Sequence, residues 1–333
     1  MAKDLSKYLE EVRFVAGEKD CELRLDHFLM GKIFWRSRSD IQDRIKKGKI
    51  LLRGAKSKAS ARLKLNDEVI VVITQEDLPD QDPRSIEINL IFENDEVVIV
   101  NKQAGVVVHP IGRHVYNTML NALALRFKKA QTGEHPHVVH RLDRDTSGVL
   151  VVAKTQAAKK TLQEVFEERH PRKEYLAIVE GVIKEDEGEI NAPLGRDDKA
   201  DIRLKMCVRE GGQTSRSHWF VEERFAAHTL VRVRIETGRQ HQIRVHLLHL
   251  GFPVVADPLY GDPRSVGLFG EEPLLERQAL HAALLQIKVP GTPIESEYCA
   301  GLPEDMNSVI EALRRGETLT KSRDVQSSRW RRA

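Results

Sequence analysis

Apolar residues at helical and strand spacings predict a small folded unit over residues 22–74. Leu25 and Leu29 fall on one face of a helix. Ile41 and Ile45 have the same spacing and indicate a second helix, followed by short apolar runs typical of strands. The second helix is expected over residues 39–47, and the strands over 49–53 and 68–73. The pattern is that of a compact α+β domain.

A larger, strand-rich domain is predicted over residues 87–312. The segment before it, residues 75–86, is acidic, contains two prolines and is typical of an interdomain linker. Thr155 is placed to cap a helix that has an apolar face. Short apolar runs that predict strands include residues 97–100, 149–152 and 230–235.

The expected fold class is therefore α+β. A small α+β domain precedes a mixed, largely antiparallel β-sheet domain with flanking helices. Residues 1–21 are interpreted as an N-terminal extension, and residues 313–333 as a basic, flexible tail.

Composition limits the possible compartments and cofactors. No apolar run approaches the ~18 residues of a membrane span, and the first residues lack the apolar region of a secretory signal. Cys21, Cys207 and Cys299 are too far apart to indicate a zinc site or a redox motif. No phosphate-binding glycine loop and no metal-ligand spacing is found. We expect a cytoplasmic protein without a metal, nucleotide cofactor or membrane partner.

A dense basic cluster lies in the small domain, although the net charge of the chain is only +3. Such a density favours a polyphosphate partner, and a solvated helix face is the alternative. From this cluster we select Arg36, Arg38, Lys46 and Lys47 as RNA contacts. The cluster comprises Arg36, Arg38, Arg44, Lys46, Lys47, Lys49, Arg53, Lys56 and Lys58.

The stretch of residues 140–148, His-Arg-Leu-Asp-Arg-Asp-Thr-Ser-Gly, draws attention to Asp143. It lies between a loop rich in glycine, proline and histidine and a strongly apolar strand, so Asp143 is expected on a loop at a strand edge. Catalytic groups often occupy such loops. A loop held together by ion pairs is the alternative interpretation of its neighbouring arginines and aspartates.

Two further stretches contain candidate site residues. Residues 173–181 predict a strand with Tyr175 near its start. Residues 237–246 predict a glycine turn followed by a helix, with Arg244 beside the buried face. An arginine in that place can carry its charge to the edge of a buried pocket.

Five motifs, in order along the chain, resemble the RluA family of pseudouridine synthases. Residues 22–74 are similar to an S4-type RNA-binding domain. The matching elements are Arg24-Leu25-Asp26, Ser37-Arg38 and residues 45–50 and 66–70. The domain order is similar to that of members acting on large-subunit ribosomal RNA. The five motifs are at 101–110, 140–148, 173–177, 238–246 and 257–261.

The resemblance implies an isomerisation of uridine to pseudouridine that needs no cofactor. It implies that Asp143 is the catalytic carboxylate, that Arg244 is its charge partner and that Tyr175 stacks on the target base. The Tyr175 hydroxyl could also assist loss of the proton from C5, the atom through which the base is rejoined to the sugar. Arg141 would occupy the space left by the flipped base, while His140 is expected to be structural. Arg239 and His241, in the same motif as Arg244, are implied as substrate contacts. Attack on C6, attack on C1′ and elimination through a glycal all remain open.

Several positions depart from the family patterns. Gln103 stands for proline, Gln240 for threonine and Ala256 for glycine, while Arg53-Gly54 and Asn66 replace the usual Asn-Gly and Gly. None of these is Asp143, Tyr175 or Arg244.

Other functions have less support. A protein-kinase loop is rejected because the accompanying motifs are missing. A metal-dependent nuclease would use His241, His246 and His249, which do not share one helical face. The same reaction on tRNA, or RNA binding without catalysis through the S4-like domain, are the remaining alternatives.

Overall fold

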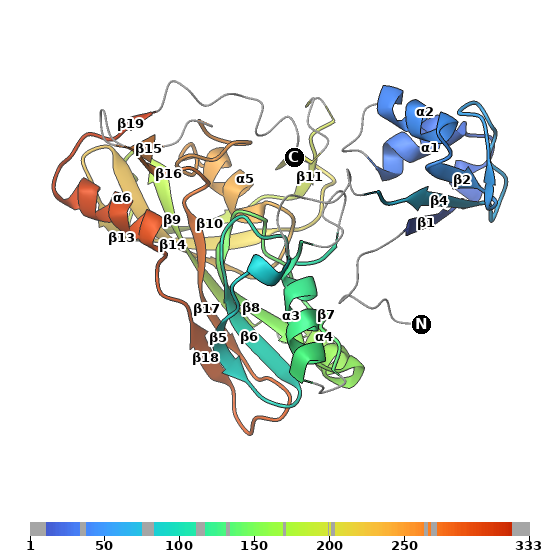
Figure 1. The fold of residues 1–333 in the computed structure, drawn as a ribbon. Coiled ribbons are helices and arrows are strands. Elements are labelled where there is room, and N and C mark those ends of the chain that lie inside the picture. Colours follow the sequence, from blue (N-terminus) through green and yellow to red (C-terminus); the bar gives the residue numbers. More distant parts are fainter. Residues whose placement is uncertain are drawn as a thin grey trace. The chain divides into compact units, whose positions relative to one another are not determined.

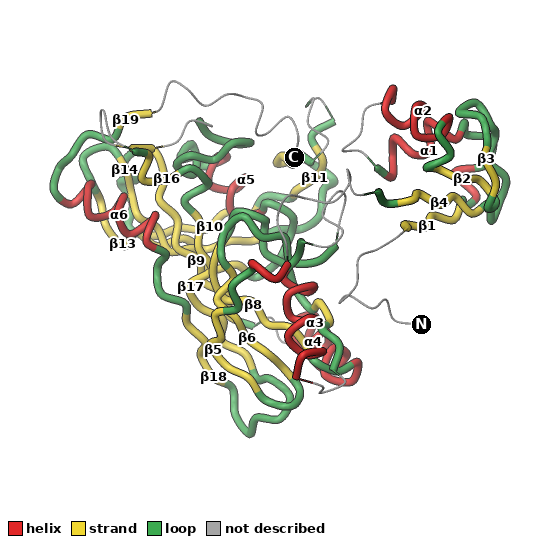
Figure 2. Tube along the Cα trace, viewed as in Figure 1, coloured by secondary structure: helices red, strands yellow, loops and turns green. Residues whose placement is uncertain are grey.

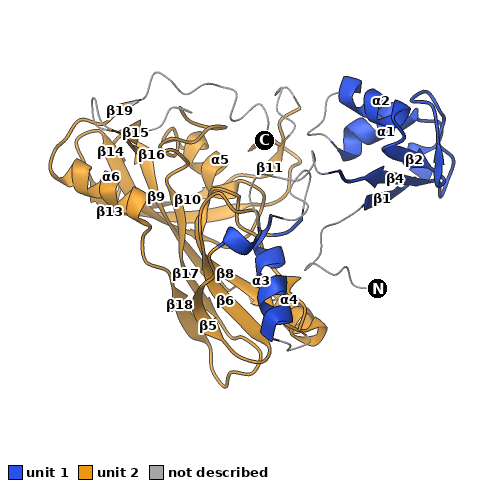
Figure 3. Ribbon diagram, in the orientation of Figure 1, with its two compact units in different colours: residues 1–86, 109–132, 332–333 blue, residues 87–108, 133–331 orange. Residues whose placement is uncertain are grey.

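The structure is a computed structural model, and its chain falls into two compact units (Figure 3). The smaller unit comprises residues 1–86, 109–132 and 332–333, and the larger one residues 87–108 and 133–331. The structure describes residues 11–33, 38–74, 83–110, 117–130, 134–168, 171–198, 200, 204–262, 266–267 and 272–321. The expected basic tail therefore lies largely outside the described residues, as does most of the expected linker.

The smaller unit contains an antiparallel sheet in the order β1-β4-β2-β3 (Figure 1). Two helices pack on it, and apolar residues such as Leu25, Ile41 and Val69 meet in its core. The predicted α+β class of the small unit is confirmed. Its elements are β1 (Glu11–Val15), α1 (Leu25–Lys32), α2 (Arg38–Lys46), β2 (Ile50–Leu52), β3 (Ala55–Lys56) and β4 (Glu68–Val72), with 3-10 turns at Glu18–Asp20 and Pro83–Ser85 and α3 at Met119–Ala130.

The sheet of this unit also includes a strand within residues 1–21, where only an extension was expected. Strand β1 pairs with β4 from Glu11 opposite Val72 to Val15 opposite Glu68. Its side chains are mostly half-buried or exposed. A strand of this kind lacks the strong apolar alternation that sequence patterns detect, so pairing with a neighbour reveals it.

The larger unit is built on a ten-stranded sheet in the order β10-β13-β14-β9-β17-β8-β6-β5, with β18 beside β17 and β7 beside β8. Figure 2 shows this unit as a strand-rich body with few helices. The predicted mixed, largely antiparallel sheet with flanking helices is confirmed. The strands are β5 (Asn89–Glu93), β6 (Val97–Lys102), β7 (His137–Val138), β8 (Ser147–Ala153), β9 (Arg172–Glu180), β10 (Glu187–Asn191), β13 (Arg216–Arg224), β14 (His228–Ile235), β17 (Leu280–Ile287) and β18 (Ser296–Cys299).

Further short strands and helices complete the larger unit. Thr155 caps α4 as predicted, since its Oγ1 accepts a hydrogen bond of 3.0 Å from the amide of Ala158. No helix in the described part of the chain is both long and apolar enough to cross a membrane. The additional elements are α4 (Gln156–Glu168), α5 (Gln242–His249), α6 (Glu304–Arg314), β11 (Leu194–Arg196), β12 (Met206–Val208), β15 (Val266–Gly267), β16 (Pro273–Leu275) and β19 (Thr320–Lys321).

A parallel pairing of β8 with β17 joins the two halves of the large sheet. Ser147 lies opposite His281, and Gly148 lies opposite Ala282. Gly148 has φ +116°, and a Cβ there would lie 2.1 Å from the carbonyl oxygen of Ala282. Only glycine allows the strands to approach this closely. The loop before β8 is thereby brought to the middle of the sheet.

Candidate active site

Asp143 lies on the loop between β7 and β8, in a turn that the amide of Thr146 closes by donating to the carbonyl of Asp143 over 3.2 Å. His140 supports the start of this loop. Its Nε2 accepts a hydrogen bond of 3.0 Å from the amide of Val151, and its ring stacks on Phe166. Burial lowers the pKa of His140 to about 3, so this histidine is neutral. These contacts agree with the structural role expected for it.

Two buried basic side chains, those of Lys102 and Arg277, hold the backbone after Asp143. Lys102, which is fully buried, donates from Nζ to the carbonyl of Arg144 over 2.9 Å and also to the carbonyls of Gln103 and Val106. Arg277 donates from Nη1 to the carbonyl of Asp145 over 3.0 Å. Two consecutive carbonyls of the loop are thus fixed from within the protein.

Arg277 is itself anchored on the C-terminal helix. Its Nε and Nη2 donate to the carboxylate of Asp305, in α6, over 2.6 and 2.8 Å. A fork of this kind fixes the orientation of the guanidinium as well as its position. The arginine therefore links α6 to the loop that carries Asp143.

The side chain of Asp143 is paired with Arg244. Nη1 of Arg244 donates to Oδ2 of Asp143 over 3.1 Å. The other face of the guanidinium is held by Asp257, with Nε to Oδ2 at 2.6 Å and Nη2 to Oδ1 at 2.7 Å. Asp257 is fully buried and also accepts from the amides of Leu259 and Tyr260. Arg244 therefore cannot turn away from Asp143 without breaking a buried ion pair.

Opposing effects act on the charge of Asp143. Burial by itself raises the pKa of its carboxyl. The charge that His241 carries when protonated and the charges of Arg244 and Arg141 outweigh this effect and hold that pKa below the ordinary value. A carboxyl that is both desolvated and matched by cations keeps its charge in a confined space. Asp143 is consequently a carboxylate at neutral pH.

Tyr175 lies on β9 and lines the same pocket as Asp143. It lies opposite Val233 of β14 and Ala282 of β17, and only 8% of its surface is exposed. Burial, together with the nearby charge of Asp143, raises the pKa of its hydroxyl above the ordinary value. The phenol is neutral at any physiological pH.

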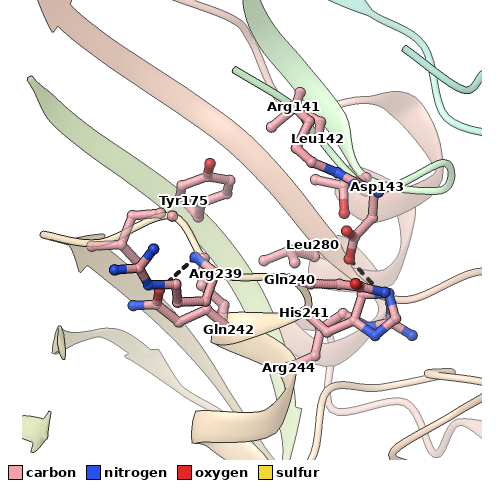
Figure 4. Close-up of a pocket in the computed structure, with 14 residues that line it drawn as sticks. Arg141, Leu142, Asp143, Tyr175, Arg239, Gln240, His241, Gln242, Arg244 and Leu280 are labelled. Carbon is pink, nitrogen blue, oxygen red and sulfur yellow. Dashed lines mark hydrogen bonds and ion pairs between the residues drawn. The ribbon is translucent and has the colours of Figure 1, made fainter. Parts of the chain in front are cut away.

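These residues line one pocket of about 480 Å³, part of it open to solvent (Figure 4). All six site residues predicted in the larger unit border it, although they come from segments far apart in the sequence. The lining residues are Arg141, Leu142, Asp143, Thr146, Tyr175, Ile235, Gly238, Arg239, Gln240, His241, Gln242, Ile243, Arg244 and Leu280.

The basic residues selected as RNA contacts belong to the smaller unit. Arg38 pairs with the buried Asp26 over 3.2 Å, and Lys47 pairs with Asp43 over 2.7 Å. Lys46 is exposed on α2. Arg36 lies outside the described residues.

One residue of the metal-nuclease alternative is committed elsewhere. Nδ1 of His246 bonds to Oγ of Ser217 over 2.9 Å, and its Nε2 bonds to the carbonyl of Ala192 over 3.0 Å. His246 is fully buried. With both ring nitrogens bound to protein, it is a structural histidine.

Comparisons with known proteins show the family to which the chain belongs. The family described as RNA pseudouridylate synthase matches residues 96–249. A Bacillus subtilis protein named uncharacterized RNA pseudouridine synthase YlyB is 36% identical over 92% of this chain and 99% of its own length. The chain belongs to the RluA family of RNA pseudouridine synthases.

Other relatives extend the match. A Xanthomonas campestris protein named ribosomal large subunit pseudouridine synthase D is 39% identical, and the match covers 84% of this chain and 85% of that protein. The solved structure of human RNA pseudouridylate synthase domain containing 1 is 27% identical, with a TM-score of 0.52. The match covers 68% of this chain and 95% of the human chain. The synthase is thus an isomerase that acts on RNA, and RNA binding without catalysis is set aside.

Sequence reasoning missed the residues that support the pocket from behind. Asp257 and Tyr260 lie in the matched motif at 257–261, which marked them as candidates. The motif did not show that Asp257 pairs with Arg244 or that Tyr260 bonds to His241. Lys102 also had a signal, because a lysine ending a buried apolar strand is unusual. Arg277 had none, since nothing around it distinguishes it from the many surface arginines of the synthase.

Proposed function

We propose that Asp143 is the carboxylate on which the isomerisation depends, and that the target is a uridine in large-subunit ribosomal RNA. The observation that carries the proposal is the hydrogen bond from Arg244 to Asp143 at the wall of the pocket. A carboxylate kept ionised there can attack the base or the sugar, or stabilise a positive centre on the sugar. Arg244 is the partner that keeps the charge of Asp143 in place.

We assign Tyr175 to binding of the uracil ring. Aromatic faces are the usual platforms for unstacked bases, and this ring borders the pocket opposite Asp143. Because the pKa of its hydroxyl is raised, Tyr175 keeps its own proton at neutral pH. It is therefore poorly suited to accept the C5 proton of the base. Stacking is therefore its principal role, with its neutral hydroxyl available as a hydrogen-bond donor or acceptor.

Entry of the uridine requires base flipping, which costs a few kcal/mol. Arg141 is an exposed cation on the pocket lining, next to the loop residue Leu142. It is suited to fill the space that the base leaves in the RNA. Arg239, also exposed and on the lining, is suited to bind a phosphate beside the flipped nucleotide.

The choice of ribosomal RNA rests on the relatives. Those from Xanthomonas campestris and Pseudomonas aeruginosa are both named ribosomal large subunit pseudouridine synthase D, and the second match covers 97% of that protein. A structured stem-loop is the proposed target because the basic cluster of residues 36–58 can follow a folded backbone. Mapping of pseudouridines in a mixture of ribosomal and transfer RNA would distinguish the two substrates.

We further propose that the two parts divide the work. In this proposal residues 22–74 form an S4-like RNA-binding domain, and residues 87–312 form the catalytic domain. The support is that the basic cluster precedes residue 75, whereas every residue of the pocket follows residue 140.

The decisive experiment replaces Asp143 with asparagine. Asp143→Asn should bind an rRNA fragment within a few-fold of wild type and release no tritium from 5-tritiated uridine. Asp145→Asn is the matched control, because Asp145 lies in the same loop but pairs with Arg144 outside the pocket lining. It should keep most of the activity. Near-normal turnover by Asp143→Asn would refute the assignment.

A further inference from the structure

His241 has an unusual backbone conformation at the edge of the pocket. It precedes helix α5 with φ 56° and ψ 20°, in the left-handed region that glycine prefers. Strained conformations of this kind persist where the surrounding structure enforces them, and they cluster at functional sites. The conformation brings the imidazole to the pocket lining beside Asp143 (Figure 4).

One ring nitrogen of His241 is bound by Tyr260. Nδ1 of His241 lies 2.7 Å from the hydroxyl of Tyr260. The same hydroxyl accepts a hydrogen bond of 2.9 Å from the amide of Met206. Tyr260 is buried, and burial raises the pKa of its phenol above the ordinary value, so the phenol keeps its proton. Its O–H needs an acceptor, and Nδ1 of His241 is the atom in reach.

This arrangement fixes the tautomer of His241. Burial lowers the pKa of the imidazole, so the ring is neutral and carries a single proton. If Nδ1 accepts from Tyr260, that proton is on Nε2. Among the residues that the structure describes, none forms a hydrogen bond with Nε2 of His241. His241, which lines the pocket, therefore carries an N–H donor that none of the described residues uses.

Tyr260 is held firmly enough to impose this choice. The guanidinium of Arg244 lies 4.9 Å from the centre of the Tyr260 ring. The backbone amide of Tyr260 donates to Oδ1 of Asp257 over 3.1 Å. The group that orients Arg244 toward Asp143 therefore also orients Tyr260 toward His241. Asp257 supports both sides of the site.

We propose that His241 donates its Nε2–H to a carbonyl oxygen of the flipped uracil, and that Tyr260 is the positioning residue that keeps the proton on Nε2. The inference rests on the proposed function, because it takes uridine as the ligand of this pocket. Uracil offers two carbonyl acceptors, and a neutral N–H matches a carbonyl better than it matches a phosphate, which arginine binds more strongly.

The donor also suits the reaction. When the glycosidic bond breaks and the electron pair stays with the base, negative charge spreads onto the carbonyl oxygens of uracil. A hydrogen-bond donor already aimed at one of them stabilises that charge and keeps the detached base in the pocket while it turns.

The first test measures the tautomer without any turnover. The full-length protein is labelled with ¹⁵N-histidine, and long-range ¹H–¹⁵N spectra are recorded at neutral pH, with His241→Gln used to assign the signals. Wild type should show the Nε2–H form of His241, and Tyr260→Phe should show a mixture of both tautomers. An Nδ1–H form in wild type would overturn the proposal.

The second test uses the shapes of the amide side chains. The amide nitrogen of glutamine reaches the place of Nε2, whereas that of asparagine reaches only the place of Nδ1. His241→Asn should lower kcat about tenfold or more, a loss typical of a single transition-state donor, with KM within about threefold. His241→Gln should restore most of kcat. Asparagine tolerates the left-handed backbone, so its loss would not come from the turn.

Modified RNA identifies the acceptor. A substrate with 2-thiouridine or 4-thiouridine at the target replaces one carbonyl oxygen with a weaker acceptor. One of these should slow wild type but should not slow His241→Asn further. Fully additive effects for both substrates would mean that His241 contacts another group, such as a phosphate, and would overturn the proposal.

Controls separate position from folding and from the proposed function. Tyr298→Phe removes the hydroxyl of a buried tyrosine on β18 that does not line the pocket, and it should leave kcat and the tautomer unchanged. Tyr260→Phe should lower kcat while its melting temperature stays close to that of Tyr298→Phe. If wild type formed no pseudouridine, the proposed function would fail, whereas the spectra would still decide how Tyr260 and His241 interact.

Discussion

The Nη1 atom of Arg244 lies 3.1 Å from Oδ2 of Asp143, and the two residues are 101 positions apart in the sequence. Arg244 can make this contact because its other two nitrogens are occupied by Asp257. One arginine thus serves two carboxylates, of which one orients it and the other borders the pocket. The separation of these two tasks makes the site testable residue by residue.

We expect the forked shape of Arg244 to matter as much as its charge. Arg244→Ala should lower the single-turnover rate by about 10²-fold, and Arg244→Lys should recover only part, since an ammonium cannot hold Asp257 and Asp143 in two directions. Arg232→Lys is the control, because Arg232 also bridges two carboxylates, Glu174 and Glu222, but lies outside the pocket lining. Full activity of Arg244→Lys would show that the fork is not needed.

The pH profile should report the charge of Asp143. Its pKa is held below the ordinary 3.8, so the ionised form persists as pH falls and is lost only when pH passes through that lowered pKa. Arg244→Ala removes a cation, which raises the pKa of Asp143 and moves the acid limb to higher pH. Between about pH 4 and 8, single-turnover rates of wild type should therefore show no acid limb, whereas those of Arg244→Ala should show one. The same pH dependence in both proteins would contradict the electrostatic role of Arg244.

Replacement of Lys102 should affect chemistry more than RNA binding. Lys102→Met leaves three carbonyls without this donor. One of them, that of Val106, is buried, where an unsatisfied group costs about 1–3 kcal/mol. Another belongs to Arg144, next to Asp143, so we expect a lower melting temperature and a lower kcat with KM nearly unchanged. Lys288→Met, at an exposed position after β17, should change none of these quantities. A loss confined to KM would argue against a role in fixing the loop.

Salt dependence should identify the residues of the small unit that bind RNA. Lys46 and Lys47 are exposed at the end of α2. Changing both to glutamine should weaken RNA binding and reduce the salt slope by about 0.7–0.9 for each phosphate that the protein no longer neutralises. The double change of Lys159 and Lys160, on α4 of the larger unit, is the matched control. Binding is titrated over a salt series, and equal slopes for the two double variants would contradict the proposed division of labour.

Ala256 offers a prediction about stability. It is buried and has φ 55°, a conformation that costs an L-residue about 1–2 kcal/mol. Ala256→Gly removes this strain but adds flexibility to the unfolded chain, so a net gain of about 0.5–1 kcal/mol is expected. Ala158→Gly, in helix α4, should instead destabilise by about 1 kcal/mol. Urea unfolding measures both, and a loss of stability in Ala256→Gly would refute the argument.

The same kind of backbone explains other departures from the family patterns. Arg53 and Gly54 have φ 53° and 75° between β2 and β3, and Asn66 has φ 65°. Arg53 occupies a left-handed turn position that favours asparagine. Its guanidinium donates two hydrogen bonds to the carboxylate of Asp67. Sequence comparison located these positions, but only the backbone shows that left-handed turns are what they have in common.

The sequence predicted the fold class and the six pocket residues because each belongs to a local pattern. Asp143, Tyr175 and Arg244 lie in short motifs at 140–148, 173–177 and 238–246, and the order of the motifs along the chain gave their expected roles by resemblance. The supporting residues act differently. Arg277 acts on a loop 132 positions earlier, and Tyr260 acts on the tautomer of His241 through one hydroxyl. Contacts of this range depend on how strands pair, which local spacing does not encode.

The parallel pairing of β8 with β17 has a consequence for synthesis of the protein. A chain leaves the ribosome from its N-terminus, so the segment carrying Asp143 emerges long before His281, the partner of Ser147 in that pairing. Until β17 arrives, the two halves of the sheet cannot join, and Arg277 cannot fix the loop. A nascent or truncated chain would thus hold most of the reactive side chains without being an enzyme. Competence is acquired only once β17 has left the ribosome.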